Sequence, residues 1–463
     1  MTRPSARRRG PHLLALLTAC ATGAALAATP ATPTPHVSYD GPALHFDFPA
    51  LEVGVAEYEE GPTGVTVLNF PRLVLAAIDV RGGAPGTINS DVVHLPHDEA
   101  RVNSIVLTGG SAYGLTAAGG VSNGLKERLA DPGDFRQVAV VAGAVIFDMG
   151  GRRFNAITPD EILGKAALKA ARPGWVPLGA RGAGRFAMQG GYFDPQHSGQ
   201  GAAFRQSGPT KVLVVTIVNS LGSIVGRDGK LLRCTHPAAG GDCGTINERI
   251  DAHLRESAAP NSAALAVPVP NGPTANTTIT CVITNEKMPF SMLQRLAIQV
   301  HNSMSRAIQP FGTLADGDTL FAVTTGEVSN PALNPVELGI LASETAWDAV
   351  LASPPPAPAL TPTSGAAPAP QAQAAVAGRY QFVPGVIAVV RLASGALQVE
   401  ISGRDSLYLA QGMPAALGFI AGDEYELKTP RADRVRFERD RHGRVVALTL
   451  APGPWPLHAE RLP

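Results

Sequence analysis

The tripeptide Asn276-Thr277-Thr278 stands between an irregular stretch rich in Pro, Asn and Gly and an alternating β-branched run, 277–284. A threonine hydroxyl is a weak nucleophile unless a base removes its proton, and a free α-amine with a pKa near ~8 could act as that base on the same residue. Cleavage between Asn276 and Thr277 would create this amine, after the Thr277 hydroxyl attacks the Asn276 carbonyl and water resolves the ester. Taken alone, Asn-Thr-Thr is also a common polar loop end and a formal glycosylation acceptor.

Two acidic residues and one asparagine are the candidate partners of Thr277. Asp316 and Asp318 are two residues apart at an expected strand start, so both carboxylates can face one site, orient the Thr277 ammonium and hydroxyl, and relay protons. The alternatives are a solvated turn or half of a calcium loop, although Asp-Gly-Asp lacks the other oxygen ligands of an EF-hand. Asn219 ends the expected strand 212–218, a place where an isolated asparagine is usually a turn former.

A second arrangement of catalytic type surrounds Ser111. An expected strand, 104–107, is followed by the sequence GGSAY at 109–113 and then by a helix, which is the setting of a hydrolase serine elbow. The match is imperfect because such an elbow has Gly two residues after the serine, where this chain has Tyr113. We expect the glycines, including Gly110, to allow close backbone approach or to present helix N-terminal amides to a substrate.

The order of the expected elements indicates a layered α/β domain over residues 40–352. Beyond it, residues 353–377 form a Pro/Ala linker, and residues 378–463 change to short strands separated by turns, which predicts a small antiparallel β barrel or sandwich. In the first domain we expect strands at 65–68, 73–80, 104–107, 138–147 and 212–218, and helices at 115–129, 161–171 and 293–308, the last of them stopping at Pro310.

The apolar stretch 13–26, which arginines precede, is typical of an export signal. Small residues near its end fit ordinary cleavage, whereas the Leu-Thr-Ala-Cys sequence ending at Cys20 has the form of a bacterial lipoprotein signal. We therefore interpret 1–27 as the signal and 28–39 as a tether. The expected location is the periplasm or cell envelope, with the protein either soluble or anchored through a lipid on Cys20.

The remaining cysteines agree with an oxidising compartment. Cys234 and Cys243 flank a Gly-rich loop and could pair, while Cys281 alternates with isoleucines on one strand face and is expected in the core. His236 lies between the first two, but no further Cys or His pair stands at zinc-ligand spacing, so we expect no metal site.

The charge balance excludes a strongly basic nucleic-acid-binding protein. Lys plus Arg and Asp plus Glu number 38 each, so no overall basic field attracts nucleic acid or anionic membrane. A small peptide or amide substrate fits this composition better, and no cofactor is expected.

Five short motifs, given in chain order at the end of this paragraph, resemble those of the DmpA family of self-processing aminopeptidases. This family includes β-aminopeptidases and the nylon-oligomer hydrolase. The resemblance covers about residues 40–328. It implies an α/β fold, a four-layer α-β-β-α sandwich, and homo-oligomers of cleaved α and β chains. The motifs are TGVTV at 63–67, RGGAPGT at 81–87, TGGSAYGL at 108–115, NTTI at 276–279 and DGDTLF at 316–321.

The resemblance also implies roles for the candidate residues. Thr277 matches the residue that becomes the new N-terminus and nucleophile, with Asn276 on the departing side. Asn219 matches an asparagine whose amide is expected to stabilise the oxyanion of the tetrahedral intermediate. Asp316 and Asp318 match a pair that is two aspartates in the nylon-oligomer branch. The implied activity is hydrolysis of small peptides or amides through an acyl-Thr277 intermediate.

At one position the chain departs from the family. Gln200 stands in Ser-Gly-Gln-Gly (198–201), where relatives carry a Lys, and it cannot replace that charge. Gln200, Phe147, Gly110 and Ser111 are the candidates for lining the substrate pocket. Phe147 belongs to a segment that lines the pocket in relatives, but we expect it to pack in the core.

Three alternatives to a hydrolase with Thr277 as its nucleophile remain open from the sequence. Ornithine acetyltransferase-like enzymes share a self-cleaving threonine and pass the acyl group to an amine. A non-catalytic exported binding protein is the second alternative, which the departure at Gln200 keeps open. The third is a hydrolase that uses Ser111.

Overall fold

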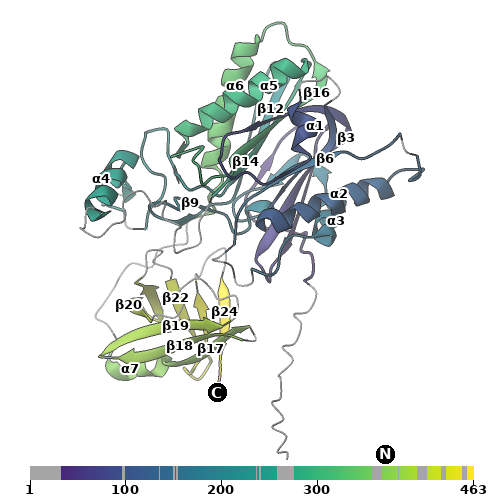
Figure 1. Ribbon diagram of the computed structural model, residues 1–463. Coiled ribbons are helices and arrows are strands. Elements are labelled where there is room, and N and C mark those ends of the chain that lie inside the picture. The colour runs from purple at the N-terminus through teal and green to yellow at the C-terminus, as the bar shows by residue number, and fades with distance from the viewer. Residues whose placement is uncertain are drawn as a thin grey trace, which may run out of the picture. The chain divides into compact units, whose positions relative to one another are not determined.

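The computed structural model describes residues 33–95, 100–134, 136–149, 152, 155–235, 237–238, 241–257, 276–356, 368–383, 385–403, 414–428, 434–450 and 456–463. These residues form an α/β domain and a C-terminal β barrel (Figure 1). The expected signal, Cys20 and the first residues of the tether lie outside the described residues, as does His236. Helix α7 (Pro370–Val376) forms within the expected linker.

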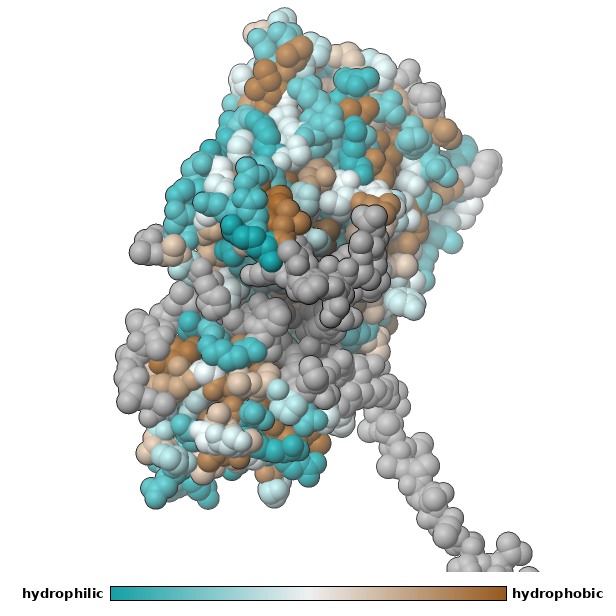
Figure 2. Space-filling model, turned by 60° about the vertical axis from the view of Figure 1, so that its left-hand side comes forward, coloured by the Kyte–Doolittle hydropathy of each residue, from teal (hydrophilic) through white to brown (hydrophobic). Residues whose placement is uncertain are grey.

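None of the described helices is both long and apolar enough to span a bilayer. On the face drawn in Figure 2, hydrophobic residues lie in small groups among hydrophilic ones.

Strand β3 (Thr63–Val80) organises the main sheet and contains both expected runs, 65–68 and 73–80. Its first half pairs with β2 (Glu52–Tyr58), and its second half pairs with β16 (Thr319–Val328). The exposed residues 71–73 mark the change between the halves, where the register with the next strand shifts. The sheet order is β11 (Gln200–Ser207), β12 (Thr210–Val218), β14 (Thr278–Glu286), β16, β3, β5 (Arg101–Thr108), β6 (Val141–Val145) and β4 (Thr87–Ile88).

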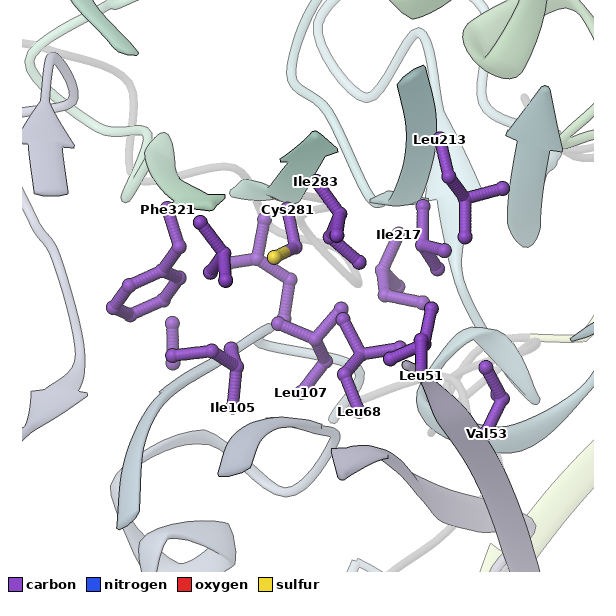
Figure 3. Packing of buried hydrophobic residues seen from close by; sticks show 14 of the residues in the cluster. Leu51, Val53, Leu68, Ile105, Leu107, Leu213, Ile217, Cys281, Ile283 and Phe321 are labelled. Atoms are coloured by element: carbon purple, nitrogen blue, oxygen red, sulfur yellow. The ribbon is translucent and has the colours of Figure 1, made fainter. Parts of the chain in front are cut away.

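The two halves of this sheet face each other across one apolar core (Figure 3). Alternate residues of each strand point into it, as the two-residue period of a strand requires. Cys281 is fully buried there, which confirms its expected core position, and burial raises the pKa of its thiol. The labelled residues of β12, β14 and β16 are Leu213, Ile217, Cys281, Ile283 and Phe321, and those in or beside β2, β3 and β5 are Leu51, Val53, Leu68, Ile105 and Leu107.

Helices cover the outer face of each half. Helices α5 (Phe290–Ser303) and α6 (Pro335–Leu351) pack on β12, β14 and β16, and α2 (Thr116–Glu127) and α3 (Glu161–Lys169) pack on β2, β3 and β5 (Figure 1). Asn334 caps α6 through a capping box, which satisfies amides at its first turn. The layers therefore run helix, sheet, sheet, helix, and the expected α-β-β-α sandwich is confirmed.

The helix expected at 293–308 is shorter than predicted. Helix α5 ends at Ser303, a 3-10 turn (Met304–Arg306) follows, and β15 (Ile308–Gln309) pairs with β13 (Ser223–Ile224). A residue before proline disfavours the helical conformation, so Gln309 before Pro310 is extended.

Cys234 and Cys243, which the sequence indicated could pair, form a disulfide in the segment between β13 and α4 (Ile246–Ser257). The remaining short elements of this domain are β1 (Ala43–His45), α1 (Ser90–His94), the 3-10 turns Ser111–Leu115 and Gly182–Gly184, β7 (Arg172–Pro173), β8 (Trp175–Pro177), β9 (Met188–Gln189) and β10 (Gln196–His197).

The C-terminal domain is a closed barrel of eight antiparallel strands, as one of the two expected forms. Aromatic side chains, among them Tyr380, Tyr425 and Phe437, fill its interior together with aliphatic residues. The strands are β17 (Gly378–Val383), β18 (Val386–Ala393), β19 (Ala396–Gly403), β20 (Ala415–Ala421), β21 (Glu424–Leu427), β22 (Arg434–Arg439), β23 (Val445–Leu450) and β24 (Leu457–Arg461).

Candidate active site

Thr277 lies directly before β14, between the ends of β12 and β16. Only 4% of its surface is exposed, and its φ of 104° is in the left-handed region. A β-branched side chain rarely adopts that region, so the backbone at this residue is strained. Hydrogen bonds hold its backbone on both sides. The backbone amide of Asn219 donates to the Thr277 carbonyl oxygen (3.2 Å), and the backbone amide of Thr277 donates to Asp316 Oδ1 (3.1 Å).

The Thr277 hydroxyl faces the turn between the two aspartates. The Gly317 amide donates to Thr277 Oγ1 over 3.1 Å. A side chain at residue 317 would block this approach, because a Cβ there would lie 2.6 Å from Oγ1 and 2.7 Å from the Ala84 carbonyl oxygen. A donated hydrogen bond favours the deprotonated form of a hydroxyl, so Gly317 can stabilise a developing alkoxide.

The Asn219 side chain contacts the carbonyl of Asn276, which belongs to the expected scissile bond. Its Nδ2 donates to the Asn276 oxygen (3.0 Å) and to the Phe147 carbonyl oxygen (2.9 Å). Its Oδ1 accepts from the Met188 amide (3.0 Å). An amide donor at this carbonyl is placed where negative charge would develop if Thr277 Oγ1 attacked it.

Each aspartate accepts from a different backbone amide of the junction. Asp316 Oδ1 accepts from Thr277, as given above, and also from Leu221 (3.2 Å), while Oδ2 accepts from the Thr313 hydroxyl (2.7 Å). Asp318 accepts from the amides of Thr278 (2.6 Å) and Gly312 (2.9 Å).

Burial changes the protonation of this acid pair. Both aspartates are 1% exposed. Removal from water raises the pKa of Asp316, and removal from water together with the neighbouring Asp316 charge raises the pKa of Asp318 to about 7. Shifts of this origin are typical of functional sites, and they let one carboxyl hold a proton near neutral pH.

The loop 81–84 supports the turn that carries the aspartates. The amides of Arg81 and Ala84 donate to the carbonyl oxygens of Asp318 (2.9 Å) and Asp316 (2.8 Å). Gly82 is needed for this approach, since a Cβ there would lie 2.3 Å from the Asp316 oxygen. The RGGAPGT motif therefore acts through its backbone.

Gln200, in contrast, has no described contact with Thr277. It is fully buried, its Nε2 donates to the Pro177 carbonyl oxygen (2.6 Å), and its Oε1 accepts from the Thr66 hydroxyl (2.5 Å). These partners make it part of the packing between β3 and β11. Phe147 reaches the site through its carbonyl oxygen, and its side chain is half-buried.

Gly110 and Ser111 have no described contact with Thr277, although they contact the segment 146–148, whose Phe147 carbonyl oxygen accepts from Asn219. The Gly110 amide donates to Asp148 Oδ1 (2.8 Å), and the Ser111 amide donates to the Ile146 carbonyl oxygen (3.0 Å). Within the described part of the chain, no base forms a hydrogen bond with the Ser111 hydroxyl. Ser111 has the positive φ (54°) of a strained strand-to-helix turn, as a serine elbow does, but without a described base on its hydroxyl the geometry supports this alternative less well than Thr277.

Sequence reasoning missed three contributors that act through the backbone, namely the amides of Gly317, Met188 and Leu221. A glycine between two aspartates was the one available signal, because it allows close approach. In the described residues no three His, Cys, Asp or Glu side chains gather as metal ligands.

Comparison with known proteins identifies similar chains. Residues 46–354 match the model of peptidase family S58. A 6-aminohexanoate-oligomer endohydrolase of Paenarthrobacter ureafaciens is 42% identical over 322 residues, which cover 66% of this chain and 85% of that protein. An uncharacterized aminopeptidase of Mycobacterium tuberculosis is 36% identical over 275 residues, covering 58% of this chain and 75% of that protein. A solved β-aminopeptidase of Burkholderia sp. aligns with a TM-score of 0.45 at 17% identity, over 67% of this chain and 88% of that one.

The raised pKa of Asp318 predicts a pH-dependent stability. The folded chain keeps a proton that the unfolded chain releases above its ordinary pKa of about 4. The free energy of unfolding contributed by Asp318 is therefore greatest below pH 4 and is lost as pH rises through about 7. The test compares Thr277→Ala, which lacks the junction hydroxyl and so stays uncut, with the double variant Thr277→Ala/Asp318→Asn. Between pH 4.5 and 7.5, the melting temperature of the double variant should fall less than that of Thr277→Ala alone. Equal falls in the two proteins would contradict the shift.

Proposed function

This chain belongs to peptidase family S58 and is a hydrolase of the aminopeptidase and amidase type, and we propose that Thr277 becomes its nucleophile by self-cleavage after Asn276. The membership confirms the family expected from the five motifs. The observation that carries the proposal is the junction itself: a buried, strained threonine has an amide donor on its hydroxyl and a second donor on the preceding carbonyl.

Self-cleavage would begin with attack of Thr277 Oγ1 on the carbonyl carbon of Asn276. The oxyanion forms next to Asn219 Nδ2, and the hydroxyl proton passes to the departing Thr277 nitrogen as the carbon–nitrogen bond breaks. Asp316, which already accepts from that nitrogen, is placed to orient it. Water then hydrolyses the resulting ester, which yields the Asn276 carboxylate and a free Thr277 hydroxyl.

Backbone strain favours this reaction. A non-glycine residue held in a sparsely populated φ region costs about 1–3 kcal/mol, and the φ of 104° at Thr277 is such a case. Scission removes the carbonyl that precedes Thr277, and with it the steric clash that makes this φ unfavourable.

After cleavage, the new amine would serve as the base for the Thr277 hydroxyl. The hydroxyl attacks the substrate carbonyl, the leaving amine takes the proton, and water hydrolyses the acyl-Thr277 ester. Asn219 Nδ2 and the Gly317 amide, which face the junction carbonyl and Oγ1 respectively, would stabilise the oxyanion and the alkoxide.

For the substrate, we propose linear peptides and aliphatic amides. The relative from Paenarthrobacter ureafaciens is named for 6-aminohexanoate oligomers, and those oligomers are the first compounds to test on this chain. We also propose that the protein is exported and that the cleaved chains assemble as a homo-oligomer. Sequencing the N-termini of purified protein and measuring its mass in solution test both.

The Thr277→Ala variant should remain one chain, because it lacks the attacking hydroxyl, whereas wild type and Thr277→Ser should give two chains on a denaturing gel. Reducing agent should not be needed to separate them, since Cys234 and Cys243 both precede the cut. The two chains should nevertheless elute together under native conditions, because β14 and β16 pair with β12 and β3 of the other piece. An active wild-type protein with an intact junction would refute the proposal.

The Asn219→Ala variant should cleave itself about 10²- to 10³-fold more slowly, which is the usual loss when one oxyanion donor is removed. The half-time of conversion, followed on a gel, measures this effect. Asn302 of α5 offers a matched control, because Asn302→Ala removes an exposed amide that has no described contact with the junction. A loss of similar size in both variants would argue against a specific role for Asn219.

A further inference from the structure

A polar cluster centred on Asp194 lies outside the candidate site, and its described side-chain partners do not include Thr277. We propose that Asp194 and the Cys234–Cys243 disulfide form a positioning device that holds residues 188–197, the hairpin of β9 and β10, against the oxyanion donor. This inference rests on the proposed function, because it assigns a role in the same reaction to residues outside the motifs.

The first contact of the hairpin is with the Asn219 side chain. Strands β9 and β10 pair through Met188 with His197 and Gln189 with Gln196. The Met188 amide donates to Asn219 Oδ1 (3.0 Å). Because this donor occupies the carbonyl end of the side-chain amide, the Nδ2 end is left to face the junction carbonyl. The hairpin therefore determines which way the Asn219 amide points.

The second contact is with the segment that follows Asn219. At the tip of the hairpin, the amides of Gly190 and Tyr192 donate to the carbonyl oxygens of Gly222 (2.7 Å) and Leu221 (3.1 Å). The amide of Leu221 in turn donates to Asp316 Oδ1 (3.2 Å). A displacement of the hairpin would thus reach both the oxyanion donor and the acid beside the Thr277 nitrogen.

Asp194 closes the tip of this hairpin. Its carboxylate accepts from the amide (2.8 Å) and the hydroxyl (2.5 Å) of Thr235, and from Gln196 Nε2 (3.0 Å). Its side chain is 11% exposed, and Arg249 lies 3.9 Å away. The bond from Gln196 lies within the hairpin, and the bonds from Thr235 tie the hairpin to the segment that contains the disulfide.

The partners of Asp194 adjoin both half-cystines. Thr235 directly follows Cys234, and Arg249 Nη2 donates to the Cys243 carbonyl oxygen (3.4 Å). The disulfide limits how far Thr235 and Arg249, the partners of Asp194 outside the hairpin, can move apart. The glycines at the hairpin tip give little stiffness of their own, since Gly190 has a φ of 69° and is followed by Gly191. The Asp194 carboxylate therefore holds the hairpin to Thr235, and the Cys234–Cys243 disulfide holds Thr235 in place.

Self-cleavage tests this device without any external substrate. The Asp194→Ala precursor, synthesised under oxidising conditions, should convert to two chains about ten- to a hundredfold more slowly than wild type, as expected for a small misplacement of catalytic groups. Asp194→Asn keeps an acceptor for the Thr235 amide and should recover to within about threefold of the wild-type rate. Asp228→Ala is the matched control, because it removes an exposed turn aspartate between β13 and Cys234. This variant should convert at the wild-type rate.

A double-mutant comparison separates positioning from general stability. Cys234→Ser with Cys243→Ser should slow conversion, and adding Asp194→Ala should lower the rate by less than about threefold more, since groups acting through one set of contacts are not additive. On mature enzyme, dithiothreitol should lower kcat for 6-aminohexanoate oligomers with little change in KM.

Equal rates for Asp194→Ala and wild type, or fully independent losses in the combined variant, would overturn the inference. So would a failure of Asp194→Asn to recover when its melting temperature equals that of wild type. If wild type itself never cleaves, the proposed function fails, and that outcome is distinct from these.

Discussion

The pairing of β14 between β12 and β16 is the constraint on which the site depends. The registers place Thr278 opposite Val218 and Ile279 opposite Thr319. Thr277 therefore comes level with the residue that follows β12, Asn219, and with the turn that precedes β16. A slip by one residue would turn every side chain of β14 to the opposite face. Burial opposes such a slip, because Cys281 and its alternating neighbours face the central core while Val282 faces the helices α5 and α6. Hydrophobic packing on both sides of one strand thus aligns three polar strand ends.

In the uncut chain, the buried acid pair at the site has no cationic partner among the described residues. The described partners of Asp316 and Asp318 are backbone amides and one hydroxyl, all neutral, and burial raises the pKa of both carboxyl groups. Two buried negative charges without a cation are unfavourable. The Thr277 nitrogen already lies 3.1 Å from Asp316. Scission would turn that amide into an amine. Neutral, this amine can act as the base; protonated, it places a positive charge beside the pair, which favours ionised carboxylates. The proposed reaction therefore supplies the charge that its own site lacks.

Local order in the sequence was enough to predict the parts of the site that lie next to strand ends. The β-branched run after Thr277, the spacing of the two aspartates and the asparagine after β12 all follow from patterns of a few residues. The order of elements indicated a layered α/β domain, and the four layers were implied by the resemblance to the family. Contacts through the backbone could not be predicted in this way. The amides of Met188 and Gly317 have no side-chain signature, and their positions depend on how distant segments pack.

Side-chain roles that depend on tertiary partners were also beyond the sequence. Gln200 stood in a motif and was a pocket candidate, yet it forms hydrogen bonds with Thr66 and Pro177 between strands. The end of α5 was misplaced because apolar spacing continues to Ile308, whereas pairing of that residue with β13 and the proline that follows Gln309 favour an extended chain. Helix α6 was not predicted, since it adjoins the Pro/Ala linker and lacks a clear polar face.

Scission at Thr277 would leave the packing of the domain intact. β14 and β16 lie between β12 and β3, so each piece of the cut chain borders the other along two strands. The cut removes one peptide bond, at a residue whose φ is unfavourable, and removes none of the sheet pairings. Afterwards Asn219 belongs to one chain and Thr277 to the other, so their separation depends on non-covalent contacts alone. The register of β12 with β14 sets it along the strands, and the hairpin 188–197 sets the direction of the Asn219 amide. In the cut protein, the position of the Asn219 side chain relative to Thr277 would thus depend on the groups that hold this hairpin.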